Sequence, residues 1–310
     1  MQLTDAHVDE LLHAAASIER SSRDMTDITL DDLTLDDLTL PTLAPVLARA
    51  LDDLLDGCGF VLLRGLPALS LSDRQLMLVF WIIGQHLGIP IPQNDAGDLF
   101  VHVRDEGLDF ANPTVRAYQT KQRLDYHSDS SDIVGLLCRH PAKSGGVSTV
   151  VSATAIHDQM VRERPDLAAR LHEPWWFDRR KANQPDNFFQ RRICAEHAGR
   201  LFTHYGRAHI ESSSRGEGIP ELSAEQVATL DLLDSFANSP DFVLNMHFQV
   251  GDIQFLNNYL ILHARTDYED WPEPERKRDL YRLWLTVRRE LDLPDDFVTG
   301  GITSRRAAFR

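Results

Sequence analysis

Histidine and carboxylate residues at alternate positions are the first feature of this sequence that could do chemistry. Alternate residues of an extended chain point to the same side, so such a pair can converge on one metal ion. Two histidines and one carboxylate are the ligand set that holds iron(II) on one face and leaves the other positions open for oxygen chemistry. With 13 histidines and 47 acidic residues among 310 positions, chance alone produces ~2 such pairs. The sequence contains three, at His7/Asp9, His127/Asp129 and His209/Glu211.

The position of a third ligand favours the middle pair. A distant histidine must supply this ligand, because the fold has to wrap around the metal. His263 ends an apolar run far downstream of His127, which leaves room for several strands and an inserted helical segment. The stretch from His209 to His263 is much shorter, too short for a barrel to close, and His7 lies in a terminal segment that we expect to be mobile. We therefore predict a metal site at His127, Asp129 and His263; the competing interpretation is a surface His–Asp pair and an unrelated core histidine.

Two arginines follow on a predicted strand. Residues 278–287 alternate so that Arg278 and Arg282 share one face with large apolar residues. Burying a guanidinium there is costly unless it meets an anion, and its planar fork suits a carboxylate. Ser148 follows soon after a double glycine, downstream of His127 at the end of a predicted hairpin, where its hydroxyl could reach the same anion. The sequence thus predicts an anion clamp beside the metal site.

Hydrophobic patterns supply the elements that must position these residues. We predict strands at about 59–65, 133–139, 147–151, 242–248, 253–256, 260–264 and 278–287, with 133–151 forming a hairpin closed by HPAKSGG. Helices are expected at 6–19, through 51–55, after the capping box Ser72-x-x-Gln75, at 153–162 and 165–172, and after Ser223-x-x-Gln226. The repeated TLDDL at 29–33 and 34–38 has too short a period for a solenoid, so we expect a surface segment. No linker divides the chain, which indicates one domain over residues 1–310.

Composition excludes several classes of function. The formal net charge of −15 argues against nucleic acid or an anionic membrane surface as a partner. No uninterrupted apolar stretch is long enough to span a membrane, and P-loop, G-x-G-x-x-G and G-x-S-x-G motifs are absent. Three widely spaced cysteines disfavour a disulfide framework and fit a reducing compartment. We expect a soluble, cytoplasmic protein that acts on a small molecule.

Three segments resemble one known family. The segments YHSDSSDIVGLLCRHPAKSGGVSTVVSA, GDIQFLNNYLILHARTDYED and RKRDLYRLWL, which contain residues 127–151 and 251–285, are similar to the taurine dioxygenase-like (TauD/TfdA, clavaminate-synthase-like) Fe(II)/2-oxoglutarate-dependent oxygenases. GFVLLRGLP near residue 60 also resembles the family's early strand. The resemblance implies a mainly β fold with flanking helices around a double-stranded β-helix (jelly-roll, cupin-like) core, with a helical insert or lid at about 153–240.

The resemblance also implies roles for the site residues. The implied Fe(II) ligands are His127, Asp129 and His263. Arg278 falls on the residue that pairs with the distal carboxylate of 2-oxoglutarate, and Ser148 stands where relatives often have threonine. Arg282 falls on a second active-site arginine, which in some relatives contacts an anionic substrate group. The implied cofactors are Fe(II), 2-oxoglutarate as co-substrate, and O2.

The implied activity is oxidation of an unactivated C–H bond in a small, carboxylate-bearing molecule such as an amino acid or natural-product intermediate. Hydroxylation with release of succinate and CO2 is the outcome we expect foremost; desaturation or cyclisation on the same site stays open. Asp129 disfavours halogenation, because related halogenases have a small residue there that lets chloride bind the metal. A non-catalytic jelly-roll protein that binds zinc or a ligand is the alternative. The arginine pair argues against it, since a structural zinc site needs no oxoacid clamp.

Further residues could line the substrate site. Five aromatic residues lie between the two motif blocks, where core packing is the competing explanation: Trp175, Trp176, Phe177, Phe188 and Phe189. Arg179 and Arg180 form a solvated patch or meet an anionic substrate. Two polar pairs complete the candidates: Gln93 and Asn94, in a cavity or a turn, and Asn257 and Asn258, which could orient the strand of His263.

Overall fold

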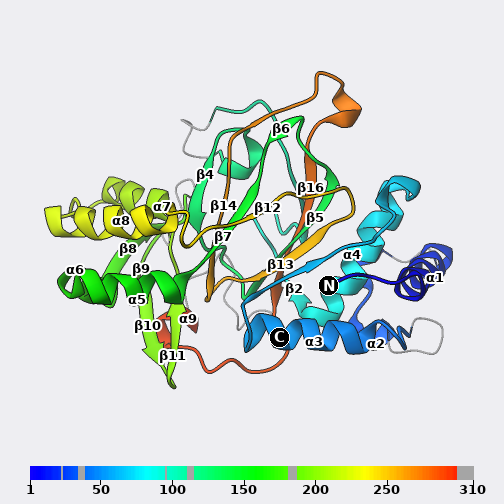
Figure 1. Ribbon diagram of the computed structural model, residues 1–310, viewed down its shortest axis with the longest axis horizontal. Helices are drawn as coiled ribbons and strands as arrows, with labels where there is room; N and C mark the ends of the chain where they lie inside the picture. Colours follow the sequence, from blue (N-terminus) through cyan, green and yellow to red (C-terminus); the bar gives the residue numbers. More distant parts are fainter. Residues whose placement is uncertain (22–23, 34–38, 95, 110–114, 181–186, 299–310) are drawn as a thin grey trace.

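Two β-sheets packed face to face form the centre of the protein (Figure 1). The computed structural model describes residues 1–310 except 22–23, 34–38, 95, 110–114, 181–186 and 299–310. The α-helices of the described part are α1 Asp5–Ser21, α2 Leu30–Leu33, α3 Ala44–Leu55, α4 Asp73–Leu87, α5 Ala153–Glu163, α6 Pro165–Arg170, α7 Arg207–Glu211, α8 Ala224–Ala237 and α9 Asp295–Val298. Its strands are β1 Phe60–Leu63, β2 Ile89–Pro90, β3 Phe100–Val103, β4 Leu124–His127, β5 Ile133–His140, β6 Ser144–Gly145, β7 Ser148–Ser152, β8 Pro174–Asp178, β9 Phe188–Arg192, β10 Cys194–His197, β11 Arg200–Thr203, β12 Leu244–Met246, β13 Ile253–Asn257, β14 Ile261–Arg265, β15 Tyr268–Glu269 and β16 Asp279–Thr286.

The two sheets are built from strands far apart in the sequence. The larger has the order β1-β13-β5-β16-β2, with β3 also paired to β16, and the smaller has the order β12-β7-β14-β4. Between them lies an apolar layer formed by Val134 and Trp284 of the larger sheet and Val150, Met246 and Ile261 of the smaller. The predicted β core with flanking helices is therefore present.

Strand β16 shows why the larger sheet is buried on both faces. All eight of its residues are buried. Its alternation sends Arg282 and Trp284 toward the smaller sheet, whereas Leu283 and Leu285 pack into the cluster that includes helix α4. Helix α4 is apolar on nearly all sides, as a helix enclosed by other elements must be. The predicted capping box at its start is confirmed: the Ser72 hydroxyl and the Gln75 side chain each bond the other residue's backbone N–H.

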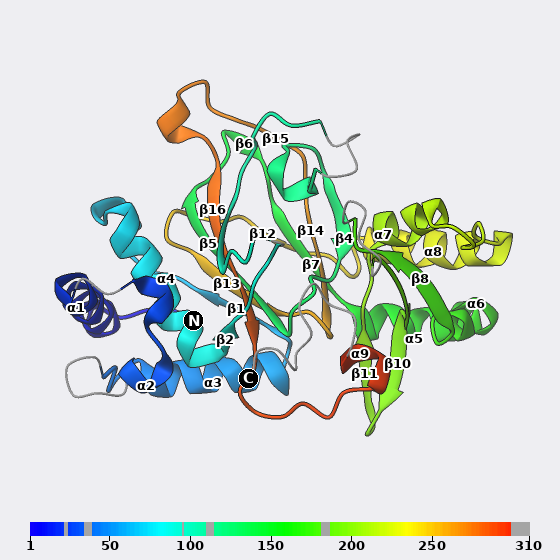
Figure 2. The same ribbon diagram turned by 180° about the vertical axis from the view of Figure 1, so that it is seen from behind.

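The N-terminal helices cover the outer face of the larger sheet (Figures 1 and 2). Helix α1 buries Leu11 and Ile18, and the Trp81 indole of α4 donates to the Ile28 carbonyl oxygen at 2.9 Å. Leu33, in the first TLDDL copy, is 1% exposed. The expected surface segment at 29–33 is thus confirmed for Thr29 and Asp31, which are exposed, whereas the Leu33 side chain instead completes the core around α4. The second TLDDL copy, 34–38, lies outside the described residues.

The predicted hairpin over 133–151 is also wrong. Strand β5 pairs with β13 and β16 in the larger sheet, whereas β7 pairs with β12 and β14 in the smaller one. The connection crosses from one sheet to the other and includes β6, which pairs with β15. Gly145 and Gly146 have φ of 71° and 64°, a left-handed conformation that allows this crossing.

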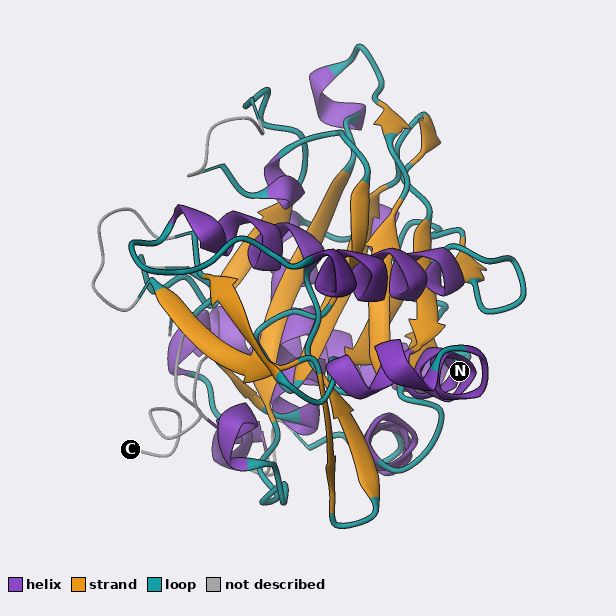
Figure 3. Ribbon diagram, turned by 90° about the vertical axis from the view of Figure 1, so that its left-hand side faces the viewer, coloured by secondary structure: helices purple, strands orange, loops and turns teal. Residues whose placement is uncertain are grey.

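Residues between β7 and β12 form a mixed segment beside the smaller sheet. Helices α5, α6 and α8 share an apolar cluster there with two hairpins, β8–β9 and β10–β11, so the segment expected to be helical is partly strand (Figure 3). It lies on the opposite side of the sheets from α1–α4 (Figures 1 and 2). Within the described residues, no helix has both the length and the apolar character needed to cross a lipid bilayer.

Candidate metal centre

Antiparallel pairing of β4 with β14 brings the two predicted imidazoles together. His127 and His263 are register partners, and their ring centroids are 4.2 Å apart. Asp129 follows the end of β4 by two residues, so its carboxylate returns to the same point. His127 Nε2 lies 3.9 Å from Asp129 Oδ1, and His263 Nε2 lies 3.6 Å from Asp129 Oδ2. One possible ligand atom from each residue falls within 4.8 Å of the others.

The protonation of these groups suits metal binding. His127 Nδ1 bonds the Asp125 carbonyl oxygen at 2.8 Å; because a carbonyl only accepts, Nδ1 has the proton and the Nε2 lone pair is available. Burial and the neighbouring His263 lower the pKa of His127 to about 3. Burial opposes ionisation of Asp129, but the Arg282 guanidinium and His263 hold the pKa of this carboxyl well below its usual range. The cluster therefore offers a neutral imidazole and a carboxylate.

The turn that presents Asp129 is fixed from two sides. The Asp129 backbone N–H donates to Asn258 Oδ1 at 3.0 Å, and the Asn258 amide donates to the Ser131 carbonyl and hydroxyl oxygens. On the other side, the Ser128 N–H donates to the Tyr205 carbonyl oxygen at 2.8 Å. Asn258 thus contacts the Asp129 turn, whereas Asn257 donates to the Leu54 carbonyl oxygen away from the cluster.

Arg282 lies immediately beside the carboxylate. Its Nη1 is 3.8 Å from Asp129 Oδ1, and its Nε donates to Gln93 Oε1 at 2.7 Å. The guanidinium lies over the rings of Tyr118 and Trp284, 4.6 and 4.9 Å from their centroids. Gln93 is therefore part of the site.

Asn94 belongs to a turn instead. Its side-chain oxygen accepts the backbone N–H groups of Ala96 and Asp98. The turn interpretation of this residue is thus the one that the hydrogen bonds support.

Arg278 and Ser148 do not line the larger cavity described below. The Arg278 Nη1 donates to the Val103 carbonyl oxygen at 3.1 Å, and its guanidinium is 5.0 Å from the centre of the Tyr268 ring. No carboxylate in the described part of the chain lies within ion-pair distance of this 4% exposed side chain, and burial lowers its pKa. The Ser148 hydroxyl donates to Gln254 Oε1 at 3.2 Å. Both residues line one small cavity with His127, Asp129 and His263.

A second cavity, of about 130 Å³, shares His127, Asp129 and Arg282 with the first. Phe177 and Phe189 of the β8–β9 hairpin stack at 5.4 Å in its wall. Trp175, in contrast, is 1% exposed in the core, with its indole N–H on the Arg170 carbonyl oxygen. The aromatic candidates thus divide between cavity wall and core packing.

Comparison with known proteins shows the family. The family model described as "Taurine catabolism dioxygenase TauD, TfdA family" matches residues 23–284, which include all six predicted site residues. The chain belongs to this family. As a TauD/TfdA-family protein it is a 2-oxoglutarate-dependent non-haem iron dioxygenase, so the non-catalytic alternative is disfavoured.

Two curated relatives of this TauD/TfdA-family dioxygenase have clear sequence similarity. It is 32% identical over 260 residues to FR-33289 synthase of Streptomyces rubellomurinus, an alignment that covers 82% of this chain and 76% of that protein. It is 28% identical over 253 residues to taurine hydroxylase-like protein SAT17 of Stachybotrys chartarum, which covers 78% of this chain and 65% of that one.

Solved structures confirm the predicted jelly-roll fold of the dioxygenase. Asparagine oxygenase in complex with Fe(II), 2S,3S-3-hydroxyasparagine and succinate superposes with a TM-score of 0.72 at 14% identity, over 92% of each chain. The non-haem iron oxygenase OrfP in complex with Fe and alpha-ketoglutaric acid has a TM-score of 0.66 at 15% identity, over 92% of each chain.

The larger cavity of this dioxygenase also has residues that the sequence patterns did not single out. Arg116 and Tyr118 precede β4, and His204 lies near the metal cluster with its ring 5.3 Å from Phe177. His209, rejected as a metal ligand, lines the cavity and bonds the Asp178 carbonyl oxygen through Nδ1 at 2.7 Å. No spacing in the sequence distinguishes Arg116, Tyr118 or His204, because they meet only through the pairing of segments around the cavity. The His209/Glu211 spacing did single out His209, but as a metal-ligand candidate and not as a residue of the cavity wall.

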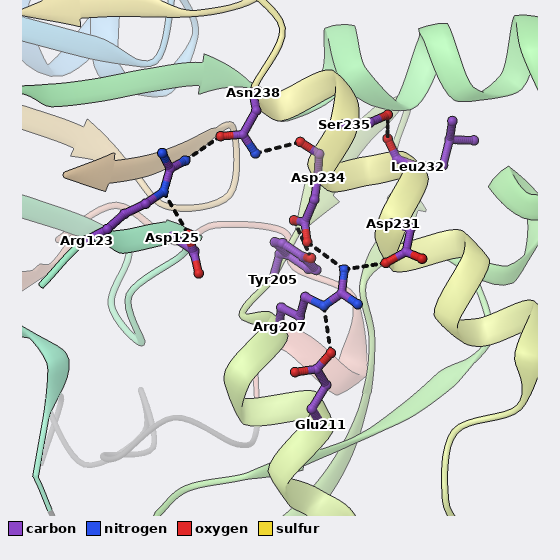
Figure 4. A network of polar contacts seen from close by, with 10 residues as sticks. All are labelled: Arg123, Asp125, Tyr205, Arg207, Glu211, Asp231, Leu232, Asp234, Ser235 and Asn238. Carbon is purple, nitrogen blue, oxygen red and sulfur yellow. Dashed lines mark hydrogen bonds and ion pairs between the residues drawn. The ribbon is translucent and has the colours of Figure 1, made fainter. Parts of the chain in front are cut away.

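A polar network joins α7 and α8 of the 153–240 segment to the start of β4 (Figure 4). The Tyr205 hydroxyl donates to Asp234 Oδ1 of α8 at 2.7 Å, and Arg207 Nη1 donates to Asp234 Oδ2 at 2.9 Å. Arg123, next to β4, donates to Asp125 and to Asn238 at the end of α8 (Figure 4). Because the Tyr205 backbone also bonds Ser128, the network links α8 to the turn that presents Asp129.

Proposed function

We propose that this dioxygenase hydroxylates an unactivated C–H bond of a small, carboxylate-bearing molecule and releases succinate and CO2. The Fe(II) ligands in this proposal are His127, Asp129 and His263. Arg278, with Ser148, binds the distal carboxylate of 2-oxoglutarate. The observation on which the proposal depends most is the buried Arg278 guanidinium: it lines the same cavity as the three ligands and has no carboxylate partner in the described part of the chain. A buried cation of this kind requires an anion.

The donor set supports iron at the cluster. Asp129 Oδ2 is buried and, among the described residues, has no hydrogen-bond partner. An orphaned carboxylate oxygen costs free energy that a bound cation recovers. The His127 tautomer directs its lone pair to the same place. Two imidazoles and one carboxylate are the ligand type of non-haem iron(II) oxygenases.

Bound iron and 2-oxoglutarate supply the oxidising chemistry: one oxygen atom of O2 enters the substrate C–H bond as a hydroxyl group, and the other enters succinate as CO2 leaves. The chain's own residues orient the reactants. Arg278 would hold the distal carboxylate of the co-substrate, and the Ser148 hydroxyl, which here donates to Gln254 Oε1, would donate to the same carboxylate. Arg282, oriented by Gln93, binds the substrate carboxylate beside the metal. Since Asp129 supplies a carboxylate to the metal, chloride has no ligand position and halogenation is disfavoured.

The segment at about 153–240 acts as a lid in this proposal. Its β8–β9 hairpin contributes Phe177 and Phe189 to the cavity wall, and apolar rings exclude water from the reacting centre.

The test is an anaerobic titration of the Fe(II) protein with 2-oxoglutarate, followed through the metal-to-ligand absorption band, and then succinate release under air with a panel of amino acids and small carboxylates. Arg278→Gln removes the guanidinium. Arg276→Gln is the matched control, because Arg276 loses the same charge two residues away but is about half exposed.

We expect the wild type and Arg276→Gln to develop the same band at the same 2-oxoglutarate concentration. Arg278→Gln loses one partner of a buried ion pair, about 2 kcal/mol or more, so its affinity for 2-oxoglutarate falls about 30-fold. Equal affinity in the two variants would refute the role of Arg278. A wild type that forms no band and releases no succinate would refute the function.

A further inference from the structure

A second buried arginine lines the small cavity beside the metal cluster. Arg265 lies two residues after His263 on β14, so the two side chains belong to the same face of the smaller sheet. Arg265 is 5% exposed, and the cavity that it lines also has Arg278 and Ser148 in its wall. Ser148 is its register partner on β7. Two guanidinium groups that are distant in the sequence therefore meet at this cavity.

Arg265 uses one of its three side-chain nitrogens for hydrogen bonds within the described part of the chain. Its Nη2 donates to the carbonyl oxygens of Thr120, at 2.9 Å, and Gln122. Its Nε and Nη1 are buried and have no hydrogen-bond partner among the described residues. These two nitrogens have three N–H groups, and buried donors without an acceptor are costly. Anchoring of residues 120–122 thus accounts for Nη2 and leaves the other two nitrogens unexplained.

The charge of Arg265 has a neighbour of the same sign. Its guanidinium and that of Arg278 lie over the ring of Tyr268, 4.8 and 5.0 Å from the ring centroid. Asp105 and Asp267 act on Arg265 from a longer range, but among the described residues no carboxylate forms an ion pair with it. Two buried cations beside one ring repel each other, and an anion between them removes that repulsion.

The cavity between these groups is large enough for a carboxylate. Its volume is about 40 Å³. One water molecule needs roughly 10–15 Å³, so a carboxylate group fits, whereas a whole substrate does not. Val134, Leu136 and Phe248 are apolar parts of its wall, which suit the methylene groups that precede such a carboxylate. The two oxygens of one carboxylate can accept hydrogen bonds from two guanidinium groups at once.

We propose that Arg265 is a second co-substrate-binding residue, which binds the distal carboxylate of 2-oxoglutarate together with Arg278. This inference rests on the proposed function, because it adds a residue to the same co-substrate pocket. Arg265 keeps its Nη2 bonds to Thr120 and Gln122, and its Nε and Nη1 are the donors for the anion. Since β4 begins at Leu124, one guanidinium connects the co-substrate with the segment that leads to His127.

The test compares two 2-oxo acids that bind the anaerobic Fe(II) protein, which cannot turn over. 2-Oxoglutarate and 2-oxopentanoate have the same metal-binding end, but 2-oxopentanoate has a methyl group in place of the distal carboxylate. Both are titrated through the metal-to-ligand absorption band and by calorimetry. The ratio of the two affinities isolates the contribution of the distal carboxylate from any general damage to the pocket.

Three variants of Arg265 and its control are titrated beside Arg278→Gln. Arg265→Gln removes the guanidinium. Arg288→Gln is the matched control, because Arg288 also donates to two backbone carbonyl oxygens, those of Gln85 and Gly88, but does not line this cavity. Arg265→Lys decides the question if Arg265→Gln does not fold: its ammonium keeps the charge and can bond the same carbonyl oxygens, but it lacks the fork that also reaches the anion.

We expect the wild type and Arg288→Gln to bind 2-oxoglutarate about 100-fold more tightly than 2-oxopentanoate, because the buried carboxylate forms charge-assisted hydrogen bonds with both guanidinium groups. Arg265→Gln should reduce this preference about tenfold and Arg265→Lys about threefold, since each removes donors from a buried charge pair. The affinity for 2-oxopentanoate should stay unchanged in both variants.

A preference for 2-oxoglutarate that both Arg265 variants retain would overturn the inference. An equal loss of affinity for the two acids would also overturn it, because that result is what a purely structural anchor of residues 120–122 produces. In either case, loss of the preference in Arg278→Gln would show that the proposed function stands without Arg265. A wild type that forms no band with 2-oxoglutarate would instead reject the proposed function itself.

Discussion

Asn258 provides the sharpest test of how the chain positions Asp129. It is 1% exposed, accepts the Asp129 backbone N–H at 3.0 Å, and donates to the carbonyl and hydroxyl oxygens of Ser131. Asn258→Ala removes all three bonds and leaves a buried N–H without a partner. At about 1 kcal/mol for each bond, we expect the free energy of unfolding to fall by about 2–4 kcal/mol.

The same substitution should weaken metal binding more than a general loss of stability explains. Without the Asn258 amide, the turn after β4 has one anchor fewer, so the Asp129 carboxylate samples positions away from the two imidazoles. Loss of a residue that orients a metal ligand typically lowers metal affinity 10- to 100-fold, and we expect an effect in this range for Fe(II) or Co(II).

Asn257→Ala is the matched control. Asn257 is 3% exposed, and its side chain donates to the Leu54 carbonyl oxygen and accepts the Tyr259 N–H, so neither of these bonds reaches the Asp129 turn. Urea unfolding and Co(II) titration of both variants separate the two effects. Asn257→Ala should lose stability and keep its metal affinity. If Asn258→Ala loses no more metal affinity than Asn257→Ala, our account of the Asp129 turn is wrong.

Three further predictions concern stability. Tyr205→Phe removes the 2.7 Å hydrogen bond to Asp234 and should lower the free energy of unfolding by about 1–3 kcal/mol, measured in urea. The affinity for 2-oxoglutarate should not change, because the backbone bond between Tyr205 and Ser128 is kept. An unchanged midpoint of urea unfolding would contradict this prediction. Gly145→Ala places a Cβ on a backbone with a φ of +71° and 2.2 Å from the Asp267 carbonyl oxygen. Gly107 has a similar φ of +72° but open space around it, so Gly145→Ala should reduce the melting temperature more than Gly107→Ala. Equal losses would show that the clash is relieved. Burial and the adjacent His157 lower the pKa of His172. The unfolded chain therefore binds more protons than the folded chain below about pH 6.5, and the free energy of unfolding falls as the pH falls. His172→Gln should make the free energy of unfolding less dependent on pH between about pH 7 and pH 5, and an unchanged pH dependence would count against this.

The convergence of His127, Asp129 and His263 could be predicted because each of the two segments that supply them has a local pattern. The spacing of His127 and Asp129 and the apolar strand that contains His263 are visible in the sequence, and only a wrapping β fold brings such segments together. The register that makes His127 and His263 direct partners could not be predicted, since it depends on the closure of the smaller sheet. The sequence did predict that Arg282 and Trp284 share one face of their strand, because successive side chains of a strand point to opposite faces even when both faces are buried.

The pairing partner of each strand was the part that could not be predicted. A period of two identifies an extended segment but not its neighbour, and the short connection between β5 and β7 is compatible with either a hairpin or a crossing between sheets. The short strands of the 153–240 segment were missed because their apolar residues also suit helices. Arg116 and His204 have no local signal, since the cavity that gives them meaning is assembled from several segments.

A crystal structure of the anaerobic protein with Fe(II) and 2-oxoglutarate tests the central claim most directly. We predict iron bound to the Nε2 atoms of His127 and His263 and to the Asp129 carboxylate, with the distal carboxylate of 2-oxoglutarate on the Arg278 guanidinium. Iron at any other set of side chains, or 2-oxoglutarate bound without Arg278, would contradict it.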